Sequence, residues 1–280
     1  MTTPAIRILV LGAHPDDAEY HAGGLIARHV DAGNCVKLVS VTDGGAGHHR
    51  LDRQTLVAKR REEAAEAGRR VGVQEYVTWD FPDGRLQPTL ELREAIISEI
   101  RRFQPDLVLT HRTCDYHPDH RAVGQAVQDA SYLVTVPLVV PDVPHLRHDP
   151  VVAYMCDLFT KPCRLQADVI IDIEPQVDRI VDMLSAHECQ VFDFLPYNHG
   201  HSDEVPETAE ERLSWLKSWY LGVIEPRRSH FADRVRELYG DEEVRYIEAY
   251  EVSEYAAELT RDRLSHLFVG FRADNTGIPE

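Results

Sequence analysis

Two short clusters of histidine and aspartate each follow an apolar run, and their residue types suit metal-dependent hydrolysis. The first cluster, His14-Pro15-Asp16-Asp17, comes directly after the apolar run at residues 6–12. The second, His117-Pro118-Asp119-His120, comes shortly after the apolar run at residues 107–110. Imidazole nitrogens and carboxylate oxygens are ligands from which proteins build catalytic zinc sites. Together the two clusters supply enough donors for one hydrolytic zinc ion.

The predicted metal site takes ligands from both clusters. A catalytic zinc binds three protein ligands and keeps one position open for water. We predict His14, Asp17 and His120 as these ligands, because the first two leave one tight turn and the third approaches from a distant segment. Asp16 lies beside them and is predicted as the general base that takes the proton of the attacking water. Ferrous iron could use the same ligands, so Zn²⁺ is the predicted cofactor and Fe²⁺ the alternative.

Two further residues of the second cluster are predicted to act without binding the metal. His117 lies three residues before His120 and can face the same cavity, where it would stabilise an oxyanion or protonate a leaving amine. Asp119 is expected to orient His117 through a hydrogen bond to its carboxylate. The nearby Cys114 could ligate a metal, but we expect it to pack under the loop as a small thiol.

Each cluster by itself also fits a turn that leads into the N-terminus of a helix. Carboxylates are favoured there by the exposed amides and the helix dipole. The metal hypothesis is preferred because both clusters fall at the carboxyl ends of predicted parallel strands, where such folds bind ligands. A dinucleotide site is disfavoured, because the first turn reads Gly12-Ala13-His14-Pro15-Asp16 and contains no GxGxxG. A dinuclear HxHxDH site is also disfavoured, because Asp115 stands where that pattern needs histidine.

Strand-like runs alternate with helical patterns along the chain, which predicts βαβ units. We therefore expect an α/β fold, a Rossmann-like three-layer sandwich with a mostly parallel sheet. Strands are predicted at residues 6–12, 35–42, 76–79, 106–110, 151–159, 168–173 and 245–252. Helices are predicted from near Asp17 through 25–32, and at 55–71, 90–103, 119–133, 176–194 and 207–220.

The chain of 280 residues, 43% of them hydrophobic, is long enough for one sizeable core. We predict a single domain over residues 1–280, with an irregular proline-rich connection near residues 135–150. The formal net charge of −17 disfavours nucleic acid and anionic membranes as partners and favours a small molecule.

Cysteine usage predicts a reducing, cytoplasmic environment. The five cysteines are odd in number and form no CxxC pair. The N-terminal apolar run is too short for a signal peptide or a membrane span, so we expect no export. Trp215 and Trp219, four residues apart on a predicted helix, are expected to make core or oligomer contacts, so a homo-oligomer is possible.

The same two clusters resemble the LmbE/PIG-L family of zinc-dependent N-acetylglucosaminyl deacetylases. The resemblance is carried by Ala13-His14-Pro15-Asp16-Asp17 and Tyr116-His117-Pro118-Asp119-His120-Arg121. Supporting stretches are Thr42-Asp43-Gly44, Arg60 with Glu63, Asp83-Gly84, Ala186-His187-Glu188-Cys189-Gln190 and Tyr246-Ile247-Glu248-Ala249-Tyr250. In motif style the chain is most similar to the bacillithiol-pathway branch.

The resemblance implies a zinc-dependent hydrolase that removes the acetyl group from an N-acetylated amino sugar or sugar conjugate. It implies the same metal ligands and the same catalytic roles as the donor analysis above. His187 resembles a family histidine that completes the site from a distant helix, and His187 and Arg60 become candidate substrate-binding residues. The residues leave two alternatives open: hydrolysis of another amide or an ester, and a non-catalytic binding module stabilised by a metal.

Overall fold

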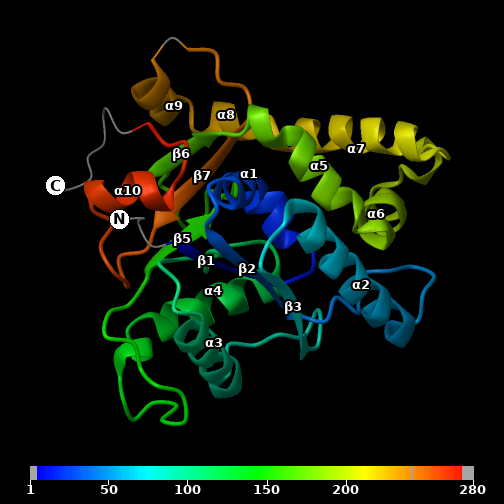
Figure 1. Cartoon of the computed structure of the whole chain (residues 1–280). Helices are drawn as coiled ribbons and strands as arrows, with labels where there is room; N and C mark the ends of the chain where they lie inside the picture. The colour runs from blue at the N-terminus through cyan, green and yellow to red at the C-terminus, as the bar shows by residue number, and fades with distance from the viewer. Residues whose placement is uncertain (1–4, 241, 273–280) are drawn as a thin grey trace.

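A seven-stranded sheet forms the centre of the computed structural model, which describes residues 5–240 and 242–272 (Figure 1). Its strand order is β3-β2-β1-β4-β5-β7-β6. Neighbouring strands from β3 to β5 pair in parallel, whereas β7 pairs antiparallel with both β5 and β6. The sheet therefore confirms the predicted α/β fold with a mostly parallel sheet. The strands are β1 (Arg7–Gly12), β2 (Cys35–Thr42), β3 (Glu75–Phe81), β4 (Leu107–Thr110), β5 (Val151–Met155), β6 (Val169–Asp172) and β7 (Ile247–Val252).

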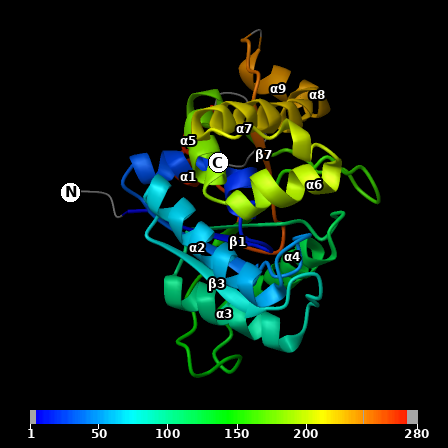
Figure 2. The same ribbon diagram turned by 90° about the vertical axis from the view of Figure 1, so that its right-hand side faces the viewer.

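Helices cover both faces of the sheet (Figures 1 and 2). Helices α1, α2 and α5 lie on one face, with α7 outside α5, and α3 and α4 lie on the other face. Helices α8 and α9 pack at the β6 and β7 end. The helices are α1 (Asp17–Asp31), α2 (Arg53–Val71), α3 (Leu90–Phe103), α4 (Pro118–Ser131), α5 (Val177–Ser185), α6 (Leu195–His199), α7 (Ala209–Ile224), α8 (Pro226–His230), α9 (Ala232–Tyr239) and α10 (Arg261–Leu267).

Strand β1 shows how the sequence divides the core into two layers. Successive side chains of a strand point to opposite faces of the sheet. Ile8 and Val10 accordingly join the core cluster on the α1 side, and Leu9 and Leu11 join the cluster on the α3 and α4 side. All four side chains are fully buried, as expected for a central parallel strand with helices on both faces.

Two predicted elements end earlier in the structure than the periodicity suggested. The predicted strand 151–159 ends at Met155, because Asp157 turns aside to pair with the buried Arg112. The predicted helix 176–194 is interrupted: α5 ends at Ser185, and a π-helical segment, η3 (Cys189–Phe194), follows. There the backbone amide of Cys189 donates to Glu63 of α2 instead of continuing the α-helix.

The proline-rich connection contains no helix or strand at residues 136–150, as predicted. A buried arginine of α3 organises it. The Arg101 guanidinium donates to the backbone carbonyls of six residues, Leu133, Val134, Val136, Val139, Val140 and Val143. One cation thus replaces the backbone ladder that this irregular segment lacks.

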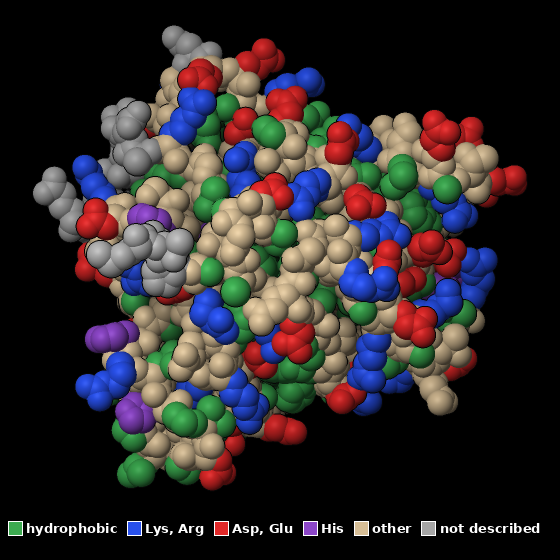
Figure 3. Space-filling model, viewed as in Figure 1, with side chains coloured by type: hydrophobic (Ala, Val, Ile, Leu, Met, Phe, Trp, Pro, Cys, Tyr) green, Lys and Arg blue, Asp and Glu red, His purple; other side chains and the backbone are tan. Residues whose placement is uncertain are grey.

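On the face shown in Figure 3, acidic and basic side chains are interspersed rather than gathered by sign.

Among the described residues, no helix is both long enough and apolar enough to cross a membrane.

Helix α1, which begins with Asp17, approaches the sheet closely at a glycine. This close approach fixes the position of the helix. The Glu248 carboxylate of β7 accepts hydrogen bonds from the backbone amides of Gly24 and Leu25, at 2.7 and 3.0 Å. A Cβ atom at Gly24 would lie 2.4 Å from Cγ2 of Ile173. Because no real Cβ tolerates such a distance, α1 can take this position only with glycine there.

We expect Gly24→Ala to lower the free energy of unfolding by about 1–3 kcal/mol, because the added methyl overpacks the core. The matched control is Gly222→Ala in α7, where no atom lies within 4 Å of the added Cβ. Alanine there should raise the free energy of unfolding by about 0.5–1 kcal/mol. Urea denaturation measures both variants, and equal stability of the two would contradict the proposed close packing of α1.

Candidate active site

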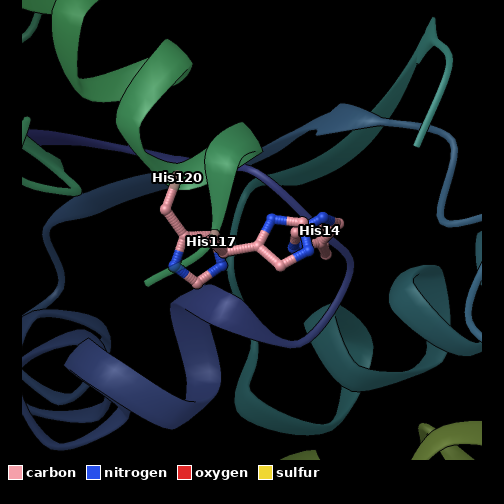
Figure 4. Close-up of side chains that lie close together, drawn as sticks. All are labelled: His14, His117 and His120. Atoms are coloured by element: carbon pink, nitrogen blue, oxygen red, sulfur yellow. The ribbon is translucent and has the colours of Figure 1, made fainter. Parts of the chain in front are cut away.

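The carboxyl ends of β1 and β4 bring the two clusters together. These strands are parallel neighbours, with Leu11 opposite Thr110, so the loops that follow them leave the same edge of the sheet. His14 lies in the first loop, His117 ends the second loop, and His120 lies in the first turn of α4 (Figure 4). The ring centroid of His14 lies 4.5 Å from that of His117 and 5.2 Å from that of His120. Segments about a hundred residues apart thus share one small space.

The Asp17 carboxylate lies between the imidazoles of His14 and His120. One oxygen is 3.5 Å from Nδ1 of His14, and the other is 3.4 Å from Nε2 of His120. Ligand atoms bound to one tetrahedral zinc at about 2.0–2.1 Å lie roughly 3.3–3.4 Å apart. Each separation matches that spacing, but the two contacts use different oxygens of Asp17.

Donor atoms that could hold a metal form three overlapping groups among the described residues. Each group has ligand atoms within 4.8 Å of one another. None of these groups contains all three predicted ligands, so the set His14, Asp17 and His120 stays a prediction. The groups are His14, His117 and His120; Asp17, His111 and His120; and His14, Asp83 and Asp119.

Further carboxylates contact the ring nitrogens of His14 and His120 that point away from Asp17. Nε2 of His14 lies 3.3 Å from Asp119 and 3.3 Å from Asp83, and Nδ1 of His120 lies 3.1 Å from Asp115. Histidines that bind a metal through one nitrogen regularly donate from the other to a carboxylate. The nitrogens that remain, Nδ1 of His14 and Nε2 of His120, are the two that face Asp17.

The crowding of carboxylates changes the ionisation of the imidazoles. Burial lowers the pKa of His14, but hydrogen bonds that its ring donates to Asp119, Asp17 and Asp83 outweigh burial and raise the pKa well above its usual value. Burial likewise lowers the pKa of His120, and the Asp17 charge outweighs it and raises the pKa to about 9. Burial raises the pKa of Asp17, but His120 and His111 hold it well below its usual value. The site therefore attracts positive charge, which a divalent ion supplies when it displaces the protons.

Asp16 precedes α1 but does not cap it. Its carboxylate makes no capping hydrogen bond to the helix, so helix capping does not explain why an aspartate stands at this position. Instead it lies 3.4 Å from the guanidinium of Arg60, in a residue whose backbone has a left-handed φ of 103°. Burial raises its pKa to about 6, against the opposing charge of Arg60. A half-buried carboxylate on a strained backbone, with no role in capping the helix, is typical of a functional group.

His117 is the N-cap of α4, so the helix-start interpretation of the second cluster is correct in part. Its Nδ1 accepts a hydrogen bond from the backbone amide of Asp119 at 3.2 Å. A neutral His117 therefore carries its proton on Nε2.

The Asp119 carboxylate does not orient His117 as predicted. It accepts hydrogen bonds from the backbone amides of Gly84 and Leu86, at 2.6 and 3.1 Å, and contacts His14. The backbone amide of Asp119, not its carboxylate, orients His117. The Asp119 carboxylate does not reach His117 because it binds the loop after β3 and holds that loop over the site.

The two candidate substrate-binding residues lie beneath the site rather than on its surface. His187 is fully buried and contacts Glu19 at 2.9 Å. Arg60 is buried and donates to the Pro15 carbonyl and to Asp16. Neither side chain offers a solvent-facing surface in this structure, and Arg60 acts on the position of Asp16.

The sequence analysis did not predict several site residues that the structure brings to this edge, although Asp43 and Asp83 lie in stretches that support the resemblance. They share a signal, because each comes within two residues of the end of a parallel strand. Asp43 follows β2, Asp83 follows β3, and His111 follows β4. Nε2 of His111 lies 3.0 Å from Asp17, and its ring stacks on His120 with centroids 3.9 Å apart.

Comparison with known proteins finds a family and several relatives. The family described as "PIG-L: GlcNAc-PI de-N-acetylase" matches residues 9–131. Diacetylchitobiose deacetylase of Thermococcus kodakarensis is 32% identical over 123 residues, 42% of this chain, and the match spans 46% of that protein. The probable N-acetyl-alpha-D-glucosaminyl L-malate deacetylase 2 of Bacillus cereus is 26% identical over 75% of this chain and 94% of its own length.

Two further comparisons bear on fold and chemistry. A 4-oxalmesaconate hydratase of Pseudomonas putida is 29% identical over 64% of this chain and 72% of its own length. The solved structure of N,N'-diacetylchitobiose deacetylase from Pyrococcus horikoshii superposes with a TM-score of 0.68 at 21% identity, and the match covers 90% of this chain and 85% of that one. This last likeness establishes the fold.

The geometry predicts which histidines hold a metal. We expect the chain to bind one Zn²⁺. Loss of a residue that only orients a metal ligand weakens metal binding by up to about 100-fold. His14→Ala and His120→Ala, which remove ligands themselves, should therefore weaken zinc binding by more than about 100-fold. His117→Ala should weaken binding less than about tenfold, because Nδ1 of His117 already accepts a hydrogen bond from the helix. Competition titration against a zinc chelator measures the affinities. Equal losses in the His117 and His120 variants would point instead to a site of three histidines.

Proposed function

We propose that this chain is a zinc-dependent amide hydrolase that removes the acetyl group from an N-acetylated amino sugar or its conjugate, because its residues 9–131 match the PIG-L family. One observation carries the proposal. The Asp17 carboxylate lies between the facing nitrogens of His14 and His120. The carboxylate of the adjacent Asp16 makes no capping hydrogen bond to the helix. A purely structural metal site would need neither an open position nor a base.

Asp16 is the proton acceptor in this proposal. Its carboxylate is held by Arg60 and by the left-handed turn rather than by the helix that follows. The Tyr76 hydroxyl, which contacts both the Asp16 backbone amide and Glu19, at 3.3 Å each, fixes the same turn from below. The carboxylate is therefore already positioned when a water molecule presents its proton, which lowers the cost of the transfer.

His117 is the proposed partner of the developing oxyanion or of the leaving amine. The helix N-terminus fixes its Nδ1 as an acceptor, so the Nε2 proton is available to a substrate atom. When bound, a zinc ion in this donor set would activate water and polarise the carbonyl group. Ferrous iron is the alternative metal.

The mouth of the site suits a sugar ring. The rings of Tyr116 and Phe159 are 67% and 40% exposed, with centroids 5.9 Å apart. The Tyr116 ring lies 5.6 Å from that of His117. Exposed aromatic rings beside polar groups provide apolar surface for one face of a sugar. The proposed substrate is therefore a small amino-sugar compound, and the cytoplasmic location and any homo-oligomer stay predictions.

A hydratase activity is the second candidate, because the hydratase relative aligns over 72% of its own length. A hydratase adds water to its substrate and releases no acid, whereas a deacetylase releases acetate and a free amine. Product analysis on N-acetylglucosamine conjugates therefore separates the two reactions. Release of an acid other than acetate would indicate the alternative amide or ester substrates.

Replacing Asp16 tests the mechanism. We expect Asp16→Asn to lower kcat for acetate release by about 100-fold or more, because the amide cannot accept the proton. Asparagine also tolerates the left-handed backbone, so the fold and the zinc content should persist. Acetate release is measured with zinc content determined by mass spectrometry on the same sample.

The control is Asp129→Asn, an exposed aspartate at the far end of α4 whose loss should leave kcat unchanged. If Asp16→Asn keeps the turnover of the unaltered protein, Asp16 is not the base. If it loses zinc as well, Asp16 holds the metal rather than the proton.

A further inference from the structure

Two cysteines lie side by side at the mouth of the site. Cys114 lies in the loop after β4, and Cys163 lies in the loop after β5. Because β4 and β5 are parallel neighbours, these loops leave adjacent positions on the same edge of the sheet. The two sulfur atoms are 3.7 Å apart, although 49 residues separate the cysteines in the sequence. Cys114 is thus not the packed single thiol that the sequence suggested.

A buried arginine holds the two loops in this relation. Arg112, two residues before Cys114, forms a two-pronged ion pair with Asp157, at 2.6 and 2.8 Å. The same guanidinium donates to the backbone carbonyls of Phe159 and Cys163, at 3.3 and 3.2 Å. Because both loops are held in place, the two thiols are already close together. Joining them therefore costs less conformational entropy than joining two mobile loops would.

We infer that Cys114 and Cys163 are a reversible redox pair, which a peroxide converts to a disulfide that lowers turnover at the neighbouring site. The exposed Cys163 thiolate attacks the peroxide, breaks the oxygen–oxygen bond and becomes a sulfenic acid. The Cys114 thiol then attacks that sulfur and expels water. Two thiols and one hydrogen peroxide thus give one disulfide and two waters, and a dithiol reductant returns the two electrons.

The disulfide would reach the site through Asp115. Closing the sulfur separation from 3.7 Å to a bond of about 2.05 Å brings the two sulfur atoms roughly 1.7 Å closer, and the two side chains and the loops that carry them share this movement. Asp115 follows Cys114 directly, contacts His120 at 3.1 Å and accepts from the backbone amide of His117 at 2.8 Å. A shift of about 1 Å in such a positioning group is enough to cost up to 100-fold in rate.

The first test maps the bond in the full-length, zinc-loaded protein. Hydrogen peroxide is added at about pH 8.5, because contact with Cys114 raises the pKa of Cys163 and the thiolate is the reactive form. Free thiols should fall by two, and digestion without reductant should give a linked peptide that contains Cys114 and Cys163. Cys35→Ser should behave like the unaltered protein, whereas Cys163→Ser and Cys114→Ser should form no such link. Absence of the linked peptide would overturn the redox pair.

The second test measures the consequence and rests on the proposed function. Oxidation should lower acetate release by about tenfold or more, and dithiothreitol should restore it, while the Cys163→Ser variant keeps its turnover. Zinc affinity is measured in parallel, since Asp115 contacts His120 whatever the reaction is. A complete disulfide with unchanged turnover and unchanged zinc affinity would overturn the coupling. A disulfide that weakens zinc binding in a protein without deacetylase activity would overturn the proposed function but support the coupling.

Discussion

The crowding of carboxylates and imidazoles at the carboxyl edge of the sheet is the constraint on which the rest of this structure depends. Asp17 faces His14 and His120, and the outer nitrogens of those rings face further carboxylates. Burying so many ionisable groups is costly unless their charges are balanced. In the absence of a metal, protons on the imidazoles supply that balance, and a divalent ion would supply it more fully.

The fold accommodates this constraint because it separates stability from chemistry. The apolar side chains of β1 build both core layers, and Gly24 allows α1 to pack closely on the sheet. The polar groups lie only where the parallel strands end, which is where open α/β sheets place their ligand sites. Buried arginines support this edge: Arg60 holds the turn of Asp16, and Arg112 holds the loops at the mouth.

Much of this arrangement was predictable from the sequence, and the remainder has physical reasons. Strand β2 and helix α3 begin and end where their periodicity and flanking residues predicted. The two clusters meet because parallel strands end at one edge. The break after α5 was not predictable, because it depends on the contact of Cys189 with Glu63. The contacts of the Asp119 carboxylate were also hidden, since its partners Gly84 and Leu86 belong to a distant loop.

The central claim is that one ion joins the two clusters through His14, Asp17 and His120. Anomalous diffraction at the zinc edge, from crystals of the zinc-loaded protein, tests this claim most directly. The account predicts one peak at about 2.0–2.2 Å from a nitrogen of His14, a nitrogen of His120 and an oxygen of Asp17. A peak bound by His14, Asp83 and Asp119, with His120 out of reach, would contradict it.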